Sequence, residues 1–188
     1  MRVIAGKYRS RPLASLPGMD LRPTSDRLRE TLFDVLCAGN RDALVARTFL
    51  DLFAGTGAVG IEELSRGAGK VVFVESSAKA AAVIRENLQS LGIADAYSVL
   101  RSDVTTALRK LETAGPADVV FLDPPYAGQT LYHGTLEALG KWNGISAESL
   151  VIAEHNKRFD PGDAVGALQR YRLLKQGDAA LSFYRRIT

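Results

Sequence analysis

Four consecutive residues could carry out chemistry, and they directly follow a short apolar run. Residues 119–122 read Val-Val-Phe-Leu, and Asp123, Pro124, Pro125 and Tyr126 come next. Because proline lacks a backbone N–H and fixes its own φ, the chain must leave its strand here in a rigid, extended turn whose carbonyls can accept hydrogen bonds. A carboxylate and a carbonyl both accept from an –NH2 group, and a tyrosine ring can stack on a heterocycle. The stretch therefore predicts a cradle for the exocyclic amine of a nucleobase; an ordinary strand exit with a tyrosine packed beneath it is the alternative.

The same four residues resemble the motif of the S-adenosylmethionine-dependent methyltransferases that act on exocyclic amines of adenine or guanine. By that resemblance Asp123, Pro124 and Tyr126 are candidate catalytic residues, and Pro125 is a candidate substrate contact. The lone pair of such an amine is delocalised into the ring, and two acceptors would draw it out of conjugation and stabilise the positive charge that develops during attack. A paired base cannot reach this site, so we expect an unpaired or flipped-out base with Tyr126 stacked on it.

A glycine-rich turn supplies the second candidate site. Gly55, Gly57 and Gly60 have the spacing G-x-G-x-x-G between a predicted strand at 49–53 and a predicted helix, and Glu75 ends the next strand. Glycine allows a tight turn and a close approach of the backbone to a ligand, and a carboxylate placed like Glu75 can bind two ribose hydroxyls. The spacing alone is that of a dinucleotide site, so it favours a nicotinamide-dependent enzyme as much as a methyltransferase.

Asp51, ahead of the glycines, distinguishes these two interpretations. Its carboxylate would repel the pyrophosphate of a dinucleotide but attract the amino group and the sulfonium of S-adenosylmethionine. The acceptor motif at 123–126 favours the same cofactor, because we expect it beside the glycine turn at the carboxyl edge of the sheet, where such folds bind ligands. Asp103 ends the third predicted strand, where it could accept from the adenine amino group of the cofactor. We therefore predict S-adenosylmethionine as the cofactor, S-adenosylhomocysteine as the product and no metal. The candidate cofactor-binding residues in these loops are Asp51, Phe53, Ala54, Gly55, Gly57, Glu75, Ser76, Asp103 and Val104.

Strands that alternate with helices must position these residues. Apolar runs predict strands at 49–53, 70–75, 96–100, 118–122 and 150–153, and the two arms of a closing hairpin at 169–175 and 180–187. Gly177-Asp178 forms the turn between the two arms. The pattern is typical of an α/β fold whose parallel sheet is covered on both faces. We expect a Rossmann-like methyltransferase fold, with a mostly parallel seven-stranded sheet and a C-terminal antiparallel hairpin.

Basic residues gather at the two ends of the chain. Residues 1–30 and 156–188 each contain seven Lys and Arg against three Asp and Glu, although the net charge of the whole chain is only +3. Residues 1–20 predict a basic β-hairpin extension, in which Lys7, Arg9 and Arg11 share one strand face and could grip a phosphate backbone. Solvated surface cations are the alternative.

A helix is predicted to follow this extension, and its apolar stripe leaves Arg22, Arg27 and Arg29 free to face a ligand, nucleic acid or water. With 188 residues, of which 46% are hydrophobic, the chain suits one α/β domain with a small appendage, so we assign 21–188 to a single methyltransferase domain. No apolar run approaches the roughly 18 residues of a membrane helix, and we expect a cytoplasmic protein without membrane contact.

Four segments together resemble one known family, the 16S ribosomal RNA guanine-N2-methyltransferases of bacteria, or RsmD family. They are residues 2–6, 22–30, 51–57 and 123–126, and the second is the most specific because other methyltransferases share the last two. The resemblance implies methylation of one guanine, of the guanine-966 type, in 16S rRNA within the 30S subunit or a late assembly intermediate. It also implies that Thr24 and Arg29 contact the cofactor and that Arg22 helps to hold RNA. We expect no obligatory protein partner.

Three alternatives remain open at this point. A DNA adenine-N6-methyltransferase shares the motif at 123–126, although the chain has little room for the target-recognition region that such enzymes generally need. A nicotinamide-dependent oxidoreductase would use the same glycine turn. A catalytically silent RNA-binding protein would keep the fold and the basic ends.

Overall fold

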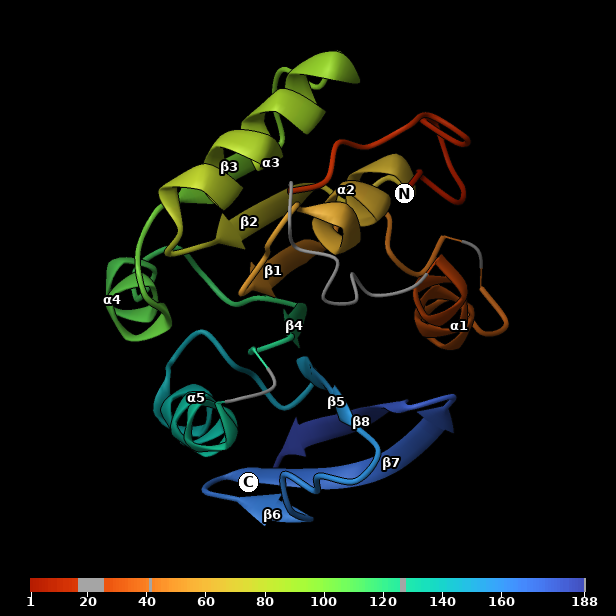
Figure 1. Cartoon of the computed structure of the whole chain (residues 1–188). Coiled ribbons are helices and arrows are strands. Elements are labelled where there is room, and N and C mark those ends of the chain that lie inside the picture. The colour runs from red at the N-terminus through yellow and green to blue at the C-terminus, as the bar shows by residue number, and fades with distance from the viewer. Residues whose placement is uncertain (17–25, 41, 126–127, 188) are drawn as a thin grey trace.

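The computed structural model of the chain describes residues 1–16, 26–40, 42–125 and 128–187 (Figure 1). In these residues one sheet of eight strands lies between two layers of helices. The helices are α1 (Asp26–Leu36), α2 (Ala58–Ser65), α3 (Ala78–Ser90), α4 (Val104–Lys110) and α5 (Gln129–Lys141). The strands are β1 (Thr48–Leu52), β2 (Lys70–Val74), β3 (Tyr97–Leu100), β4 (Val119–Leu122), β5 (Leu150–Asn156), β6 (Ala164–Val165), β7 (Leu168–Gln176) and β8 (Ala179–Arg186).

The strand order places the ends of β1 and β4 side by side in the middle of the sheet. The order is β3-β2-β1-β4-β5-β8-β7-β6, with parallel pairing from β3 to β5 and antiparallel pairing from β5 to β6. The chain winds outward from β1 to β3 and then returns to start β4 on the other side of β1. Open α/β sheets bind ligands where the winding reverses in this way, outside the carboxyl ends of the strands.

Apolar side chains on both faces of the sheet explain why the strands read as continuous hydrophobic runs. Phe49 and Phe73 point into a core shared with α1, α2 and α3, whereas their neighbours Leu50 and Val72 point into a second core shared with α4 and α5. Figure 1 shows α4 and α5 on one side of the sheet and α1 and α2 on the other. The predicted Rossmann-like α/β fold is confirmed. No helix in the described part of the chain is long and apolar enough to span a membrane.

Two features of the sheet differ from the prediction. The described strands number eight rather than seven, because the two-residue β6 pairs with the start of β7. Strand β5 also continues past residue 153 to Asn156, because its second half is held by antiparallel pairing with β8, from His155 opposite Ala180 to Asn156 opposite Ala179. Glu154 and His155 therefore lie inside a buried strand rather than just past its end.

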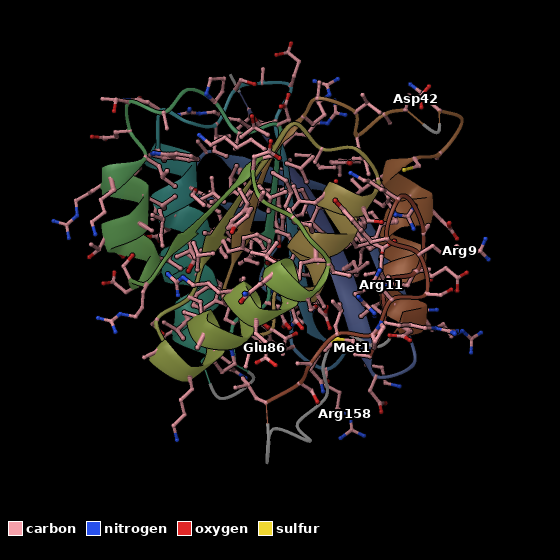
Figure 2. The ribbon with its side chains drawn as sticks, turned by 90° about the horizontal axis from the view of Figure 1, so that it is seen from above. Met1, Arg9, Arg11, Asp42, Glu86 and Arg158 are labelled. Carbon is pink, nitrogen blue, oxygen red and sulfur yellow. The ribbon has the colours of Figure 1, made fainter. Side chains whose placement is uncertain are left out.

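The predicted strand face of Lys7, Arg9 and Arg11 is wrong. Within residues 1–16 a single antiparallel bridge joins Arg2 to Pro12, and residues 5–10 form turns, so the three exposed cations do not share a strand face. Arg9 points outward (Figure 2), whereas the Arg11 guanidinium donates to the Ser90 carbonyl at 3.1 Å.

Helix α2 explains the conformation of this N-terminal segment. The backbone N–H groups of Ile4 and Ala5 donate to the Glu62 carboxylate at 2.7 and 2.9 Å, and that of Lys7 donates to the Ser65 carbonyl at 2.7 Å. In a longer hairpin these N–H groups would donate to the opposite strand. Here they donate to α2 instead, so the hairpin does not extend further.

We predict that Gly60→Ala destabilises the protein by about 1–3 kcal/mol, the usual cost of overpacking a core. A Cβ at Gly60 in α2 would lie 2.8 Å from the Val71 Cγ1 and closer still to the Phe73 ring, and both side chains are buried in the sheet. Urea unfolding measures the change in the free energy of unfolding.

Gly134→Ala is the matched control for this substitution. Gly134 lies inside α5 with nothing within 4 Å of an added Cβ, so alanine should stabilise the helix by about 0.5–1 kcal/mol. Equal effects of the two substitutions would show that the contact between α2 and β2 is not tight.

Candidate active site

Two loops meet at the carboxyl edge of the sheet and carry the residues that the sequence singles out. Leu52 ends β1 and is paired with Leu122, which ends β4, so the glycine turn and the Asp123 turn leave the sheet next to each other. The Asp123 N–H lies 3.5 Å from the Leu52 carbonyl, which continues the pairing one step further. The predicted neighbourhood of the two motifs is therefore present.

The glycine turn has a backbone that few residues adopt. Gly55 and Gly57 have φ of 56° and 78°, and Phe53 has a φ of 60° although it carries a side chain. A left-handed conformation at a residue other than glycine costs on the order of 1–3 kcal/mol and persists where the surroundings impose it, often at functional sites. The Gly57 N–H donates to the Ala54 carbonyl at 2.7 Å, which closes the turn directly before α2.

Glu75 holds the glycine turn against the end of β2. Its two carboxylate oxygens accept from the Gly55 N–H at 2.9 Å and from the Ser77 N–H at 2.7 Å. The side chain is partly exposed, and each oxygen keeps a further lone pair that can accept from a hydroxyl. Ser76, between these residues, is exposed. Glu75 can thus fix the turn and bind a ribose at the same time.

Asp51 is a buried carboxylate beneath the glycine turn. It is 2% exposed, and its Oδ2 accepts from the Gly60 N–H at 3.0 Å. Burial raises the pKa of Asp51 to about 7 and the nearby Glu75 charge adds to the increase, while the hydrogen bond from Gly60 opposes it. Ionisation of Asp51 therefore costs more in the folded protein than in water, and a positive charge nearby lowers this cost.

Asp123 lies near two other carboxylates, Glu154 and Asp51, and this grouping was not predicted from the sequence. Leu122 of β4 is paired with Ala153 of β5. Asp123 and Glu154 are the next residues of these two chain segments, so they leave the pair side by side. The pKa of Asp123 is raised well above its usual value, first by burial and then by repulsion from Glu154 and Asp51. Glu154 is itself 2% exposed. An acidic residue inside an otherwise apolar strand was the available signal for Glu154, but β5 was expected to end before it.

The Pro124 carbonyl, the second predicted acceptor, is held by a side chain from α5. The Tyr132 hydroxyl lies 3.3 Å from this carbonyl and 2.9 Å from the Glu154 carbonyl, so its one proton can serve either of them. Tyr132 and Pro124 are both buried, whereas Pro125 is exposed. No feature of the sequence indicated Tyr132. Tyr126 lies outside the described residues.

Arg29 contradicts the expectation that it would face a ligand, RNA or water. The side chain is fully buried on the inner face of α1, and its guanidinium donates to the carbonyls of Ala58 at 3.3 Å and Arg2 at 2.7 Å, and to the Asp26 carboxylate at 2.6 Å. It thereby joins α1, the N-terminal segment and the start of α2, which follows the glycine turn. Its predicted neighbours Arg22 and Thr24 lie outside the described residues.

Asp103 has a structural task as well as its predicted one. It is the N-cap of α4, where Oδ1 accepts from the Thr106 N–H at 2.9 Å, and this hydrogen bond is the main cause of a lowered pKa of Asp103. Val104 begins the helix and is buried. The side chain of Asp103 is exposed, so contact with a cofactor stays a prediction.

The chemistry of the edge fits S-adenosylmethionine better than a dinucleotide. Asp51 and Glu75 place two carboxylates around a turn whose backbone permits close approach. Such a pair suits a ligand with a cationic group and a ribose diol, and it would repel a pyrophosphate.

Comparisons with known proteins identify the family of this chain. The family model described as "Conserved hypothetical protein 95" matches residues 1–185. Ribosomal RNA small subunit methyltransferase D of Haemophilus influenzae is 35% identical over 84% of this chain and 79% of its own length.

The solved structure of a hypothetical protein from Thermus thermophilus is 30% identical, covers 97% of this chain and 98% of its own, and superimposes with a TM-score of 0.81. SMU.776, crystallised with S-adenosylhomocysteine, is 15% identical with a TM-score of 0.62 over 77% of this chain and 48% of its own, and shares the fold. Family match and sequence identity together show that this chain belongs to the RsmD family of methyltransferases.

Proposed function

We propose that the protein transfers a methyl group from S-adenosylmethionine to the N2 amine of one guanine in 16S ribosomal RNA. The observation that carries the proposal is the pair of acceptors, the Asp123 carboxylate and the Pro124 carbonyl, beside the glycine turn at the carboxyl edge of the sheet. The name of the Haemophilus influenzae relative supports the RNA of the small ribosomal subunit as the substrate. The choice of N2 and of a guanine of the 966 type rests on the family resemblance.

The chain's own residues would bind the cofactor in two ways. Glu75 accepts from the ribose hydroxyls, and Asp51 gives up its proton and balances the positive charge of the bound cofactor. Phe53, Ala54, Gly55 and Gly57 form the turn against which the cofactor lies, and Asp103 accepts from its adenine. When bound, S-adenosylmethionine supplies an activated methyl group on a sulfonium, and S-adenosylhomocysteine is left as product.

Asp123 and Pro124 would act on the amine. Both accept its N–H groups, so the nitrogen lone pair turns out of the ring plane and forms the new N–CH3 bond while the S–CH3 bond breaks and sulfur keeps the electron pair. The methylated nitrogen then carries a surplus proton. Burial and the Glu154 charge raise the pKa of Asp123, which makes this carboxylate a better acceptor for that proton.

The substrate would be unpaired or flipped-out RNA in the 30S subunit or a late assembly intermediate, in the cytoplasm where ribosomes assemble. The exposed cations Lys7, Arg9 and Arg11 lie on one N-terminal segment and can contact phosphates although they share no strand face. DNA methylation at adenine N6 is the second candidate because the acceptor pair would serve that amine equally. Transfer of tritiated methyl groups to 30S particles, free 16S rRNA and DNA distinguishes these substrates, and titration with S-adenosylmethionine and NAD identifies the cofactor.

We expect Asp123→Ala to lower kcat for RNA methylation by at least about 100-fold, the usual effect of removing a group that stabilises developing charge. The dissociation constant of S-adenosylmethionine should change little. Because Asp123 is repelled by Glu154 and Asp51, its removal should leave the melting temperature at pH 8 unchanged or higher. Equal losses of cofactor binding and methylation would show instead that Asp123 is a structural residue.

Cofactor affinity should increase with pH up to about 7 and level off above it. The pKa of Asp51 is raised to about 7, so below this pH its proton must leave before a cation is bound, at a cost of up to about tenfold in affinity for each pH unit. Isothermal titration calorimetry in buffers of different ionisation enthalpy measures the released proton. Asp51→Asn keeps an oxygen for the Gly60 N–H, and it should bind more weakly with no comparable pH dependence; wild-type binding without proton release at pH 6 contradicts the assignment.

Tyr132→Phe tests the orientation of the Pro124 carbonyl. The substitution keeps the buried ring but removes the hydroxyl that lies 3.3 Å from this carbonyl, and we expect about a tenfold lower kcat with unchanged affinity for S-adenosylmethionine. A loss of stability of about 1 kcal/mol accompanies the lost hydrogen bonds. If kcat at a temperature well below unfolding is unaffected, Tyr132 does not position the acceptor.

A further inference from the structure

A small pocket opens beside the proposed acceptor pair, between the start of α5 and the end of β5. Its volume is about 280 Å3, and it is lined by Gln129, Tyr132, Asn156, Arg158 and Phe159. The buried Tyr132 ring belongs to this lining, while its hydroxyl lies 3.3 Å from the Pro124 carbonyl on the other side. The pocket and the acceptor are thus one side chain apart.

The lining combines aromatic surface with hydrogen-bond donors. The Phe159 ring is partly exposed and packs on Tyr132 with the ring centres 4.9 Å apart. The Asn156 Oδ1 accepts from the backbone N–H of Arg158 at 2.9 Å, which fixes the turn. The side-chain –NH2 group of Asn156 has no partner among the described residues. The Gln129 amide and the Arg158 guanidinium also have no partner within that part of the chain.

Two nearby cations, unlike Arg158, are paired with carboxylates of the protein. Lys157 pairs with Asp178 at 3.1 Å, and Arg170 binds Asp160 at 2.7 Å. Another hollow, of about 340 Å3, lies along α3, but its Arg85 donates to the carbonyls of Ala81 and Val99 and does not need a ligand. The α5–β5 pocket therefore offers charge and hydrogen-bonding capacity that the described protein does not use itself.

Figure 2 shows on which side of the molecule Arg158 lies. Arg158 points outward at the end of the molecule opposite to Asp42, which precedes β1 and so marks the amino ends of the parallel strands. Arg158 therefore lies at the carboxyl edge, where the glycine turn and Asp123 also lie. Arg158 and the acceptor pair thus share one edge of the sheet.

We propose that this pocket binds a second nucleotide of the RNA, a close neighbour of the methylated guanine in the same strand. Its base stacks on Phe159, its edge accepts from Asn156 and exchanges hydrogen bonds with Gln129, and Arg158 contacts its phosphate. Single-stranded RNA is recognised in this way, by aromatic stacking together with contacts to base edges. A volume near the lower end of the roughly 300–1,000 Å3 of small-ligand pockets suits one nucleotide rather than a longer segment.

This inference rests on the proposed function, and its test separates the two. The Michaelis constants for free 16S rRNA and for 30S particles are measured for the wild type, Gln129→Ala, Arg158→Ala and Asn156→Asp, which keeps the oxygen that accepts from the Arg158 N–H. Each variant should raise the constant about tenfold for every one of these RNAs that the wild type methylates, which equals about 1.4 kcal/mol and is of the order of one hydrogen bond. The dissociation constant of S-adenosylmethionine should stay within about twofold.

Lys157→Ala is the matched control, because it removes one positive charge from the neighbouring position, outside the pocket, and should leave both constants unchanged. A similar rise in this control would indicate general charge attraction and overturn the proposal. So would unchanged constants in the pocket variants. Where the wild type methylates both RNAs, an effect on 30S particles alone would likewise overturn it and point to a ribosomal protein. A wild-type protein that methylates neither RNA refutes the proposed function itself, irrespective of the pocket variants.

Discussion

The organisation of the site depends on the electrostatic cost of bringing several carboxylates to one edge of a parallel sheet. Asp51 and Glu154 are buried, and Asp123 lies between the strands that carry them. Burial raises the pKa values of Asp51 and Asp123, and repulsion adds to the increase, from Glu75 on Asp51 and from Glu154 and Asp51 on Asp123. Ionisation of these carboxyl groups therefore costs more in the ligand-free site than in water. A cationic ligand lowers this cost, and the same charges that disfavour the empty site then contribute to binding. Apolar cores on both faces of the sheet stabilise the scaffold in which this arrangement is held.

The loops of the site are held by side chains that come from other elements. Glu75 at the end of β2 binds the N–H of Gly55, and Tyr132 of α5 binds the carbonyl of Pro124. Arg29 of α1 reaches the carbonyl of Ala58, directly after the glycine turn. Because these contacts satisfy backbone groups, they hold the turns in position while leaving the outer lone pairs of the acceptors to a ligand.

Local patterns were sufficient for most of the fold. The parallel strands, the glycine turn and the closing hairpin around Gly177 were predicted and are present, because burial of a strand on both faces imposes a continuous apolar run that the chain must encode locally. The two-residue β6 and the extension of β5 to Asn156 were not predicted, because partners in β7 and β8 decide them. The strand face of Lys7, Arg9 and Arg11 was predicted wrongly, because α2 takes up the backbone donors of residues 4, 5 and 7.

The sequence by itself determined which residues carry the chemistry, since Asp123, Pro124 and the glycines after Asp51 form contiguous motifs whose backbone restrictions are local. Only the tertiary structure decided what surrounds them. Glu154 reaches Asp123 across a strand pair, Tyr132 meets Pro124 from a helix, and Arg29 turns inward although its helix pattern suggested exposure. Such contacts depend on distances between segments far apart in the chain, and neither the spacing nor the type of a residue encodes those distances.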